Sequence, residues 1–350
     1  MILPDRVKDI LVVNQKNHIG DSICSLPFYD ELKKKYTRAS ITLVAAVQPY
    51  QMPLSELLPQ VDDILYYDKS SISTIFRFYR RLRRKKYQIG IVPSAITQSR
   101  TAHIINFLSG AAIRVGVNSI DHRLNPMRYL LNVKGDFAWT ANKVHQTDRF
   151  LDVVRLIGCD NLTFHHTPAR LSVPSKDVAE AQEYLNSVFP EKAAFTIGLH
   201  PGAGRTWSIW NVEKFLAVIK KIDQKFDARF IIDYGITDEE IIRRMRTFLV
   251  DANIPHRMLM NPFKLVKGIL SLLDVYITNN TGPMHIAGAV GTKTIALCRK
   301  DEAFEWAPRG DHMYIIESPS DDINDITVEL VFEKCRSVLE NSRSGRESAG

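Results

Sequence analysis

Short apolar runs alternate with amphipathic helical patterns along this chain, and this alternation constrains the fold more than any other feature. In the first half, apolar runs lie at 10–14, 41–47, 63–68, 89–94 and 113–117, and helical patterns at 22–36, 72–86 and 100–109. A repeated strand–helix–strand order predicts a parallel sheet with helices on both faces. Residues 118–172 lack this order, and we expect them to end the first domain and form a connection.

The same alternation begins again in the second half. The stretch 196–204 is expected to be a strand that runs into a glycine-rich turn, and 274–285 a strand, a turn and a helix start. Further strands are expected at 229–233 and 292–298, the latter being the last buried one, and helices at 211–226, 238–252, 264–272 and 323–340. The sequence therefore predicts two doubly wound α/β domains, with bounds at 1–172 and 173–322, a C-terminal helix at 323–341 and a disordered tail at 342–350.

Length and composition agree with two globular domains. A chain of 350 residues is long enough to bury two cores, and 45% hydrophobic with 24% charged residues is typical of globular proteins. Doubly wound sheets bind ligands beyond the carboxyl ends of their strands. Two such domains facing each other would therefore hold a ligand in the cleft between them.

Net charge and the arrangement of cysteines limit the classes of binding partner and the cellular compartment that we expect for this protein. A net charge of +7 and a pI of about 9.1 favour anionic partners, such as phosphorylated sugars, nucleotides, an anionic membrane surface or nucleic acid. The cysteines form no CxxC pair, which predicts reduced thiols in a cytosolic protein. The N-terminus lacks a signal-peptide pattern, and the apolar runs are too short to span a membrane. We expect a cytoplasmic protein that would meet a membrane only at its surface.

A glycine-rich stretch in the second half is a candidate phosphate loop. In HPGAGRTWSIW (200–210), Gly202 and Gly204 would let the backbone approach a ligand closely, beside the cation of Arg205. An ordinary turn between a strand and a helix is an equally good interpretation of this stretch taken alone.

A second candidate lies in TNNTGPMHIAGA (278–289). Thr281 can cap a helix whose first turn carries Pro283, a residue suited to an early helical position. Free amides and the helix dipole at that end favour an anion. His285 lies one turn further on, and beside a second candidate phosphate loop we expect it to face a ligand, although a lone helical histidine is more often structural.

Asp21 poses a question of its own, because it follows Gly20 where the first strand gives way to a helix, in NHIGDSICSLP (17–27). A carboxylate there can cap the helix at 22–36 or be aimed at a substrate. The residues alone leave the two interpretations equal.

The stretch IFRFYRRLRRKKY (75–87) carries seven basic residues on a helical pattern. A solvated helix face is the simpler interpretation, and attraction to phosphates of a membrane or a lipid acceptor is the functional one. Nothing else supports a nucleic-acid-binding fold, so we expect no nucleic-acid partner.

Several enzyme classes are disfavoured by missing motifs. No D-x-D motif is present, which argues against a metal bound by that motif. There is also no G-x-S-x-G, no GxxxxGK[ST] and no GxGxxG after a strand. These absences argue against α/β-hydrolases, P-loop enzymes and ordinary dinucleotide oxidoreductases.

Taken together, three stretches resemble the heptosyltransferase family of glycosyltransferases, family 9. They are HIGDSICSLPFYDELKKKYTRASITLV near the start, IGLHPGAGRTWSIWNVEKF in the middle and ITNNTGPMHIAGAVGTKTIAL late in the chain. Their order and separation fit the family over nearly the whole chain. The resemblance implies the GT-B fold, with two facing Rossmann-like domains, the first for the acceptor and the second for the nucleotide sugar.

The resemblance also implies a reaction and its site residues. The family transfers heptose from ADP-heptose to the inner core of lipopolysaccharide, at the cytoplasmic face of the inner membrane of Gram-negative bacteria. By this resemblance Asp21 is the general base, which we favour over a helix cap, in an inverting transfer that needs no metal and no resident cofactor. The late turn that would lie against the donor diphosphate comprises Thr281, Gly282, Pro283 and His285.

The chain departs from the family pattern at two donor positions. Ser208 stands where the family usually has a phosphate-contacting lysine, and Arg205 is a candidate replacement. Asn280 stands where the family usually has an aspartate that contacts the sugar, and an amide can donate as well as accept a hydrogen bond.

Candidate acceptor contacts in the first domain are Gly20 and the basic residues Arg100, Arg114 and Arg123.

The leading hypothesis is therefore a monomeric glycosyltransferase that acts on a lipopolysaccharide acceptor, with peripheral contact to the inner membrane. One alternative is a GT-B enzyme that uses a different nucleotide sugar, and another is a GT-B-like epimerase. A third is a nucleotide-sugar-binding protein that has lost catalysis through the changes at Ser208 and Asn280.

Overall fold

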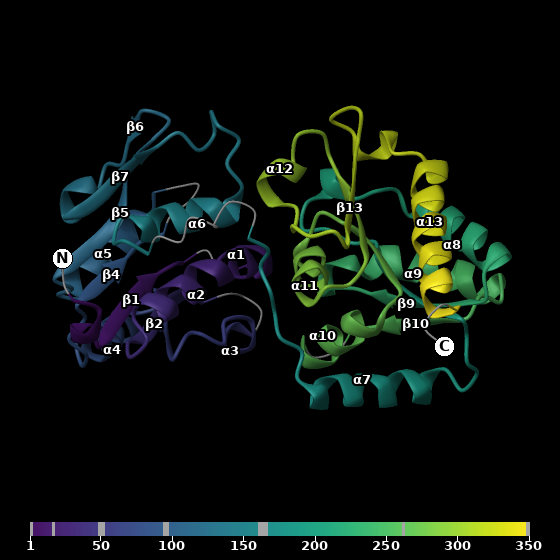
Figure 1. Ribbon diagram of the computed structural model, residues 1–350, viewed down its shortest axis with the longest axis horizontal. Coiled ribbons are helices and arrows are strands. Elements are labelled where there is room, and N and C mark those ends of the chain that lie inside the picture. The colour runs from purple at the N-terminus through teal and green to yellow at the C-terminus, as the bar shows by residue number, and fades with distance from the viewer. Residues whose placement is uncertain are drawn as a thin grey trace. The chain divides into compact units, whose positions relative to one another are not determined.

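The structure, a computed structural model, describes residues 3–15, 18–47, 53–93, 98–159, 167–260 and 263–347. The chain divides into two compact units, Met1–Ala169 and Arg170–Gly350, here called the first and the second domain. Each is an α/β domain built on a largely parallel sheet (Figure 1).

The first domain has a sheet of strand order β3-β2-β1-β4-β5-β6, with β7 paired to β5. All pairs are parallel except β5 with β6. Because β2 and β3 lie on one side of β1 and β4 and β5 on the other, the strand order reverses between β1 and β4. The strands are β1 Asp9–Val13, β2 Ser40–Ala46, β3 Asp63–Tyr67, β4 Ile89–Ile91, β5 Ile113–Ile120, β6 Arg123–Leu124 and β7 Val133–Phe137.

Helices cover both faces of this sheet. Leu11 and Val13 of β1 lie in one apolar core with side chains of α4 and α5. Ile10 and Val12, which alternate with them, are also fully buried, and α2 packs against α6. The helices are α1 Ile19–Cys24, α2 Leu26–Lys35, α3 Leu54–Leu57, α4 Ile72–Leu82, α5 Arg100–Leu108 and α6 Gln146–Arg155, with 3₁₀ turns at Pro4–Arg6 and Arg128–Leu130.

The second domain repeats this plan with a wholly parallel sheet of order β10-β9-β8-β11-β12-β13. The reversal of strand order lies between β8 and β11. The strands are β8 Phe195–His200, β9 Ala228–Asp233, β10 His256–Leu259, β11 Val275–Asn279, β12 Thr294–Cys298 and β13 Met313–Glu317.

Two groups of helices enclose this second sheet. Ile197 and Leu199 of β8 belong to the core that α8, α9 and α13 complete, and α13 lies beside α8 (Figure 1). Gly198 faces the other way, toward Leu273 and Tyr276, and α10 packs against α7 and α11. The helices are α7 Ser175–Val188, α8 Val212–Lys225, α9 Glu239–Asp251, α10 Phe263–Leu272, α11 Gly282–Val290, α12 Ala303–Trp306 and α13 Val328–Glu347, with 3₁₀ turns at Thr206–Ser208, Ile236–Asp238 and Ile323–Asp325.

The helix expected at 22–36 is two helices, and Pro27 accounts for the break. Pro27 has no N–H and cannot donate to the carbonyl one turn before it. The chain ends α1 at Cys24, passes through Ser25, and starts α2 at Leu26. The single-helix prediction was wrong at this point.

The region 118–172, expected to be irregular, is largely structured. It contains the end of β5, the strands β6 and β7, and α6. The strand β7 has the sequence VKGDF, in which two charged residues flank a glycine, so it lacks the apolar run of a central strand. The last buried strand, expected at 292–298, is β12, and beyond it β13, MYIIE, is a half-exposed edge strand that the sequence did not predict.

The C-terminal helix begins and ends later than predicted. It spans Val328–Glu347, so residues 342–347, expected to be disordered, are helical. Ser342 stabilises this extension, because its hydroxyl donates to the Val338 carbonyl at 2.7 Å and accepts from Lys293 Nζ at 2.8 Å. The rest of the expected tail, 348–350, lies outside the described residues.

The four cysteines, Cys24, Cys159, Cys298 and Cys335, are all buried and outside any disulfide, as the sequence predicted. Over the described ranges, the helices are each too short or too polar to cross a membrane.

Candidate active site

In the second domain, Asn279 joins the two loops that the sequence singled out. The strands β8 and β11 are neighbours, with His200 opposite Thr278, so the loops that follow them begin side by side. The buried Asn279 Nδ2 donates to the carbonyls of Pro201 at 2.8 Å and Gly202 at 3.2 Å, and its Oδ1 accepts from the Trp210 N–H at 3.2 Å. Sequence reasoning missed Asn279, which gives no signal beyond being the first of two asparagines at a strand end.

Gly202 is required by packing within its own domain. A Cβ at Gly202 would lie 2.3 Å from the carboxylate of Asp238. That carboxylate is fixed, because its Oδ2 accepts from the Gly235 N–H at 2.7 Å. Gly204 differs, because it is exposed and a Cβ there would meet open space.

The exposed cation of the glycine-rich loop is Arg205. Its guanidinium carbon lies 5.8 Å from the centre of the Trp207 ring, and the Trp207 side chain is 57% exposed. Ser208 is buried, and its N–H donates to the Arg205 carbonyl at 3.0 Å. Trp210 anchors the end of the loop, since its Nε1 donates to the Ile326 carbonyl at 3.0 Å. The loop thus presents Arg205 and Trp207 to solvent and turns Ser208 inward.

The helix α11 begins at the second loop with an open end. Thr281 is its N-cap residue in position, but the Thr281 hydroxyl makes no capping hydrogen bond. Thr281, Gly282 and Pro283 are half-buried. The amide dipoles at this end are therefore partly accessible, as an anion site requires.

His285 lies deeper than the residues before it. It is only 4% exposed, and its ring meets Trp306 edge to face with 6.3 Å between ring centres. The ligand contact expected of His285 stays a prediction, and in the structure the His285 ring packs against Trp306.

A carboxylate lies next to Asn280 that the sequence did not point to. Asn280 Nδ2 donates to Glu302 Oε2 at 3.4 Å, and Arg299 Nη1 lies 3.3 Å from Glu302 Oε1. All three side chains are half-buried. Position 280 itself carries no acid, but an acid from 22 residues further along the chain, Glu302, thus lies beside it in space.

A buried triad of polar side chains, His200, Asp233 and Tyr276, connects the strands β8, β9 and β11 close to these loops. His200 Nδ1 pairs with Asp233 Oδ2 at 2.9 Å, and the Tyr276 hydroxyl donates to Asp233 Oδ1 at 2.7 Å. Burial alone would lower the pKa of His200, but the charge and hydrogen bond of Asp233 outweigh it and raise that pKa above its usual value. Burial, and then Asp233, raise the pKa of Tyr276 well above its usual value. The triad ties β8, β9 and β11 together.

In the first domain, Asp21 lies in the first turn of α1, just beyond the carboxyl end of β1. The N-cap of α1 is His18 and that of α2 is Ser25, so Asp21 is the N-cap residue of neither helix. Its side chain is half-buried, as is Gly20. The helix-cap interpretation is therefore wrong, and Asp21 stands at the edge of the sheet where doubly wound domains bind ligands.

Arg100 belongs to the same edge of the first sheet. It is the first residue of α5 and is exposed. Ser99, which precedes it, donates its hydroxyl to Gln15 Oε1 at 3.1 Å and so joins the loop after β4 to the loop after β1. This contact lies at the reversal of strand order.

The structure does not bring Arg114 to that edge. Arg114 is the second residue of β5, at the amino end, and its guanidinium donates to the carbonyls of Leu130 at 2.7 Å and Ala111 at 2.9 Å. Arg123 lies in β6, an exposed short strand that turns back beyond the carboxyl end of β5. Of the three expected basic contacts, Arg100 alone shares the β1/β4 edge with Asp21.

Two Rossmann-like domains that each gather polar loops where the strand order reverses are the architecture of the GT-B glycosyltransferases. This is the class that the fold and the loops define. Within the described residues, no three His, Cys, Asp or Glu side chains are grouped to hold a metal ion.

The comparison with known proteins gives the family. The family model described as glycosyltransferase family 9 (heptosyltransferase) matches residues 75–334, more than half of the chain, and the chain belongs to this family. The matched segment begins after Gly20 and Asp21. A curated relative, lipooligosaccharide heptosyltransferase 2 of Campylobacter jejuni, is 24% identical over 172 residues, which is 48% of this chain and only about half, 52%, of that protein.

Solved structures show the same fold over nearly the whole chain. A glycosyltransferase of family 9 from Veillonella parvula aligns with a TM-score of 0.77 and 19% identity, covering 95% of this chain and 98% of that one. The ADP-heptose lipopolysaccharide heptosyltransferase II of E. coli aligns with a TM-score of 0.76 and 19% identity, covering 96% and 99%. The predicted GT-B fold with two Rossmann-like domains is thus confirmed.

Proposed function

We propose that this glycosyltransferase transfers heptose from ADP-heptose to an inner-core lipopolysaccharide acceptor, with inversion and with Asp21 as general base. The observation that carries the proposal is the position of Asp21, at the carboxyl end of β1 and in neither helix cap, in a chain of the heptosyltransferase family. The named relatives, a lipooligosaccharide heptosyltransferase and an ADP-heptose heptosyltransferase, support this donor and acceptor class.

The proposed reaction moves one proton and one glycosyl group. An acceptor hydroxyl oxygen attacks the anomeric carbon from the face opposite the diphosphate, the bond from that carbon to the diphosphate oxygen breaks, and Asp21 takes the hydroxyl proton. The products are the inverted glycoside and ADP. General-base help of this kind is worth roughly 10²–10⁴ in rate.

The second domain would stabilise the ADP that leaves. Arg205 offers an exposed guanidinium, and the end of α11 at Thr281 and Gly282 offers amide dipoles. These groups could balance the charge that develops on the diphosphate without a metal, and the lack of a D-x-D motif supports that part of the proposal. Gly204 leaves room for a ligand beside Arg205.

The acceptor side of the proposal rests on charge. Inner-core acceptors carry phosphates and carboxylates, and Arg100 is an exposed cation on the β1/β4 edge. Because such an acceptor is anchored by its lipid, we further propose that the enzyme acts as a monomer at the cytoplasmic face of the inner membrane.

A donor screen tests the proposal. Purified protein is incubated with ADP-heptose, ADP-glucose, UDP-sugars or GDP-sugars, with and without a Kdo-bearing lipid A acceptor, while nucleotide release and product mass are followed. The expected result is ADP release that needs both ADP-heptose and acceptor. Asp21→Asn should abolish transfer without loss of thermal stability, while Asp5→Asn, an exposed carboxylate of the same domain, should leave it unchanged.

Other outcomes select the alternatives. Transfer from a different nucleotide sugar would keep the mechanism and replace the donor. A changed sugar without acceptor would indicate an epimerase, and donor binding without turnover a protein that has lost catalysis. Full activity of Asp21→Asn would remove Asp21 from the mechanism.

A further inference from the structure

The helix α4 of the first domain is held firmly on the sheet by one face. Its N-terminus has a capping box, in which the Ser71 hydroxyl accepts from the Thr74 N–H at 3.1 Å and Thr74 Oγ1 accepts from the Ser71 N–H at 3.2 Å. Phe78 and Leu82 are buried against the sheet, and Phe78 meets Tyr67 edge to face. The orientation of the opposite face is therefore fixed.

That opposite face exposes large apolar side chains. Ile72 is 87% exposed and Phe76, one turn further along, is 69% exposed. The exposed arginines Arg77 and Arg80 lie on the same outward side at helical spacing, and the exposed Arg84 follows in the turn after the helix. Residues 72–86 contain no acidic residue at all.

The cations of α4 and of the segment that follows it, 83–85, differ in how they are paired. Arg81 and Lys85 share the carboxylate of Asp63, at 3.0 Å and 3.8 Å, and Arg83 Nε donates to the Leu108 carbonyl at 3.2 Å. By contrast, Arg77, Arg80 and Arg84 have no carboxylate within ion-pair distance in the described part of the chain. Their charges are available to an external anion.

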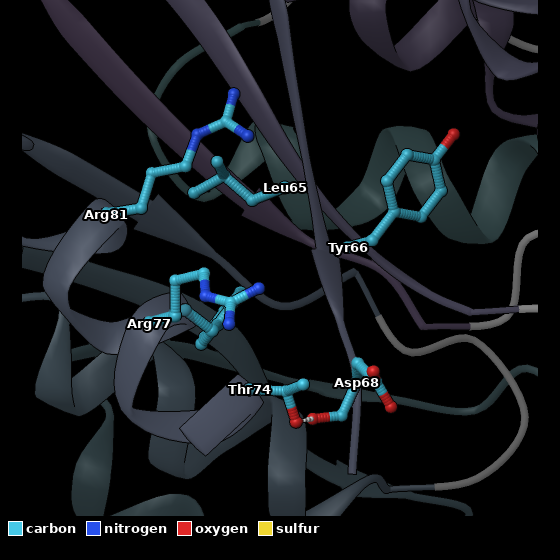
Figure 2. A pocket seen from close by; sticks show the side chains of 7 residues that line it. Leu65, Tyr66, Asp68, Thr74, Arg77 and Arg81 are labelled. Atoms are coloured by element: carbon cyan, nitrogen blue, oxygen red, sulfur yellow. Dashed lines mark hydrogen bonds between the residues drawn. The ribbon is translucent and has the colours of Figure 1, made fainter. Parts of the chain in front are cut away.

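A hollow of about 180 Å³ between β3 and α4 continues the surface. Figure 2 shows Arg77 and Arg81 reaching from α4 toward β3, on the side of the strand where Leu65 lies, whereas the Tyr66 side chain extends from the opposite side of that strand. One acid, Asp68, lines the hollow, and its carboxylate already accepts from the Ser70 N–H and hydroxyl, each at 2.8 Å. The hollow thus adds the guanidinium of Arg81 to the exposed face.

We propose that this face, Ile72, Phe76, Arg77, Arg80 and Arg84, docks on a bilayer of anionic phospholipid. An interfacial helix places apolar side chains among the acyl chains near the headgroups while its arginines meet anionic headgroups. Nucleic acid would satisfy the arginines but would leave Ile72, the most exposed of the apolar residues, in water. The inference rests on the proposed function in its choice of a membrane as partner, but it is measured without donor or acceptor.

The test is binding of the full chain to large unilamellar vesicles, measured by cosedimentation. Vesicles of phosphatidylethanolamine with phosphatidylglycerol are compared with vesicles of phosphatidylcholine alone. We expect binding to the anionic vesicles that weakens with added salt. Arg77→Gln/Arg80→Gln/Arg84→Gln should weaken it about a hundredfold, because each cation near such a surface contributes roughly a fivefold factor.

Two further variants separate the docking face from net charge. Ile72→Ser/Phe76→Ser should weaken binding about tenfold even at high salt, because part of the lost contact is apolar. Lys192→Gln/Lys220→Gln/Arg246→Gln removes three exposed cations from the second domain and should change binding less than about twofold if the face on α4 is the docking site. Circular dichroism and thermal midpoints establish that each variant is folded.

Several results would overturn the proposal. They are an absence of binding to the anionic vesicles, an equal loss in the second-domain control, or tighter binding to a single- or double-stranded oligonucleotide that the same α4 variants abolish. Heptosyl transfer to a delipidated, soluble acceptor should be unaffected by the α4 variants. Failure of the proposed function would instead appear as no transfer by the unaltered protein, whatever its affinity for vesicles.

Discussion

Asn279 Nδ2 donates to the carbonyl of Pro201 at 2.8 Å, and this hydrogen bond fixes the loop after β8 to the end of β11. The two loops that carry Arg205 and Thr281 are 76 residues apart in the chain, since 281 − 205 = 76. Their relative position in the fold depends on this one buried amide and on the pairing of β8 with β11. A substitution of the buried Asn279 should therefore weaken the hold on both loops of the proposed donor site without changing an exposed residue.

We expect Asn279→Ala to destabilise the protein by about 1–3 kcal/mol, because it leaves the buried N–H of Trp210 and the carbonyl of Pro201 without a partner. Donor affinity should fall as well, since the glycine-rich loop would no longer be held. Urea unfolding and donor titration measure the two effects. Asn186→Ala, an exposed position on α7, is the control, and equal stability of both variants would contradict the role of Asn279.

The two glycines of the loop should respond differently to alanine. Gly202→Ala forces a Cβ to within 2.3 Å of the Asp238 carboxylate, so we expect a loss of about 1–3 kcal/mol in unfolding free energy. Gly204→Ala meets open space and should cost less than about 0.5 kcal/mol. Chemical denaturation of both variants tests this. If Gly204→Ala is stable yet binds donor more weakly, a ligand lies close to the backbone there.

The buried pair of His200 and Asp233 predicts a pH dependence of stability. Because the pKa of His200 is raised in the folded state, the pair contributes its full stability below the unfolded histidine pKa of about 6.5 and loses it as pH rises through the folded value. The difference in unfolding free energy between the unaltered protein and His200→Gln should therefore shrink as pH rises above that range. His256→Gln, at a half-buried histidine paired with the Ile254 carbonyl, is the control. A difference that stays constant with pH would show that folding does not raise the pKa of His200.

Much of this architecture follows from local sequence, because central parallel strands are continuous apolar runs. Val12 and Val44 lie in such runs, and both strands fall within about a residue of their predicted bounds. The strand β7, with Lys134 and Asp136, has no such run and was missed. Pro27 indicates a helix break, but the prediction followed the helical periodicity on both sides of it and gave a single helix.

The candidate site was only partly predictable for a different reason. Asp21, Gly202 and Thr281 follow the carboxyl ends of strands, which is where doubly wound sheets bind ligands, so the sequence could identify them. Asn279 and Glu302 gain their roles from contacts between separate loops, and no local pattern encodes such contacts. The contact with an acceptor that the sequence suggested for Arg114 stays a prediction, and the structure shows its guanidinium bound to backbone carbonyls at the other end of the sheet.

Arg205 should account for much of the donor affinity if the proposed function holds. A charged hydrogen bond to a phosphate is worth about 1.5–3 kcal/mol, so we expect Arg205→Gln to raise the donor KM about tenfold or more. The exposed Trp207 beside it should have a smaller effect when changed to Ala. Arg243→Gln, an exposed arginine paired with Glu240, is the matched control. Donor kinetics in which Arg205→Gln and Arg243→Gln agree would exclude Arg205 as the phosphate cation.

Glu302 is the residue that we expect to contact the sugar in place of an acid at position 280. Its carboxylate accepts from Asn280 Nδ2 at 3.4 Å and lies beside Arg299, beyond the carboxyl end of β12. Glu302→Gln should lower kcat/KM for the nucleotide sugar about tenfold while leaving the affinity for the free nucleotide unchanged, because the lost contact is to the sugar. Glu329→Gln, an exposed acid at the start of α13, controls for charge. The double variant Asn280→Asp/Glu302→Gln moves the acid to position 280 and should recover part of the activity. A Glu302→Gln enzyme with unchanged kcat/KM would mean that Asn280 meets the sugar alone.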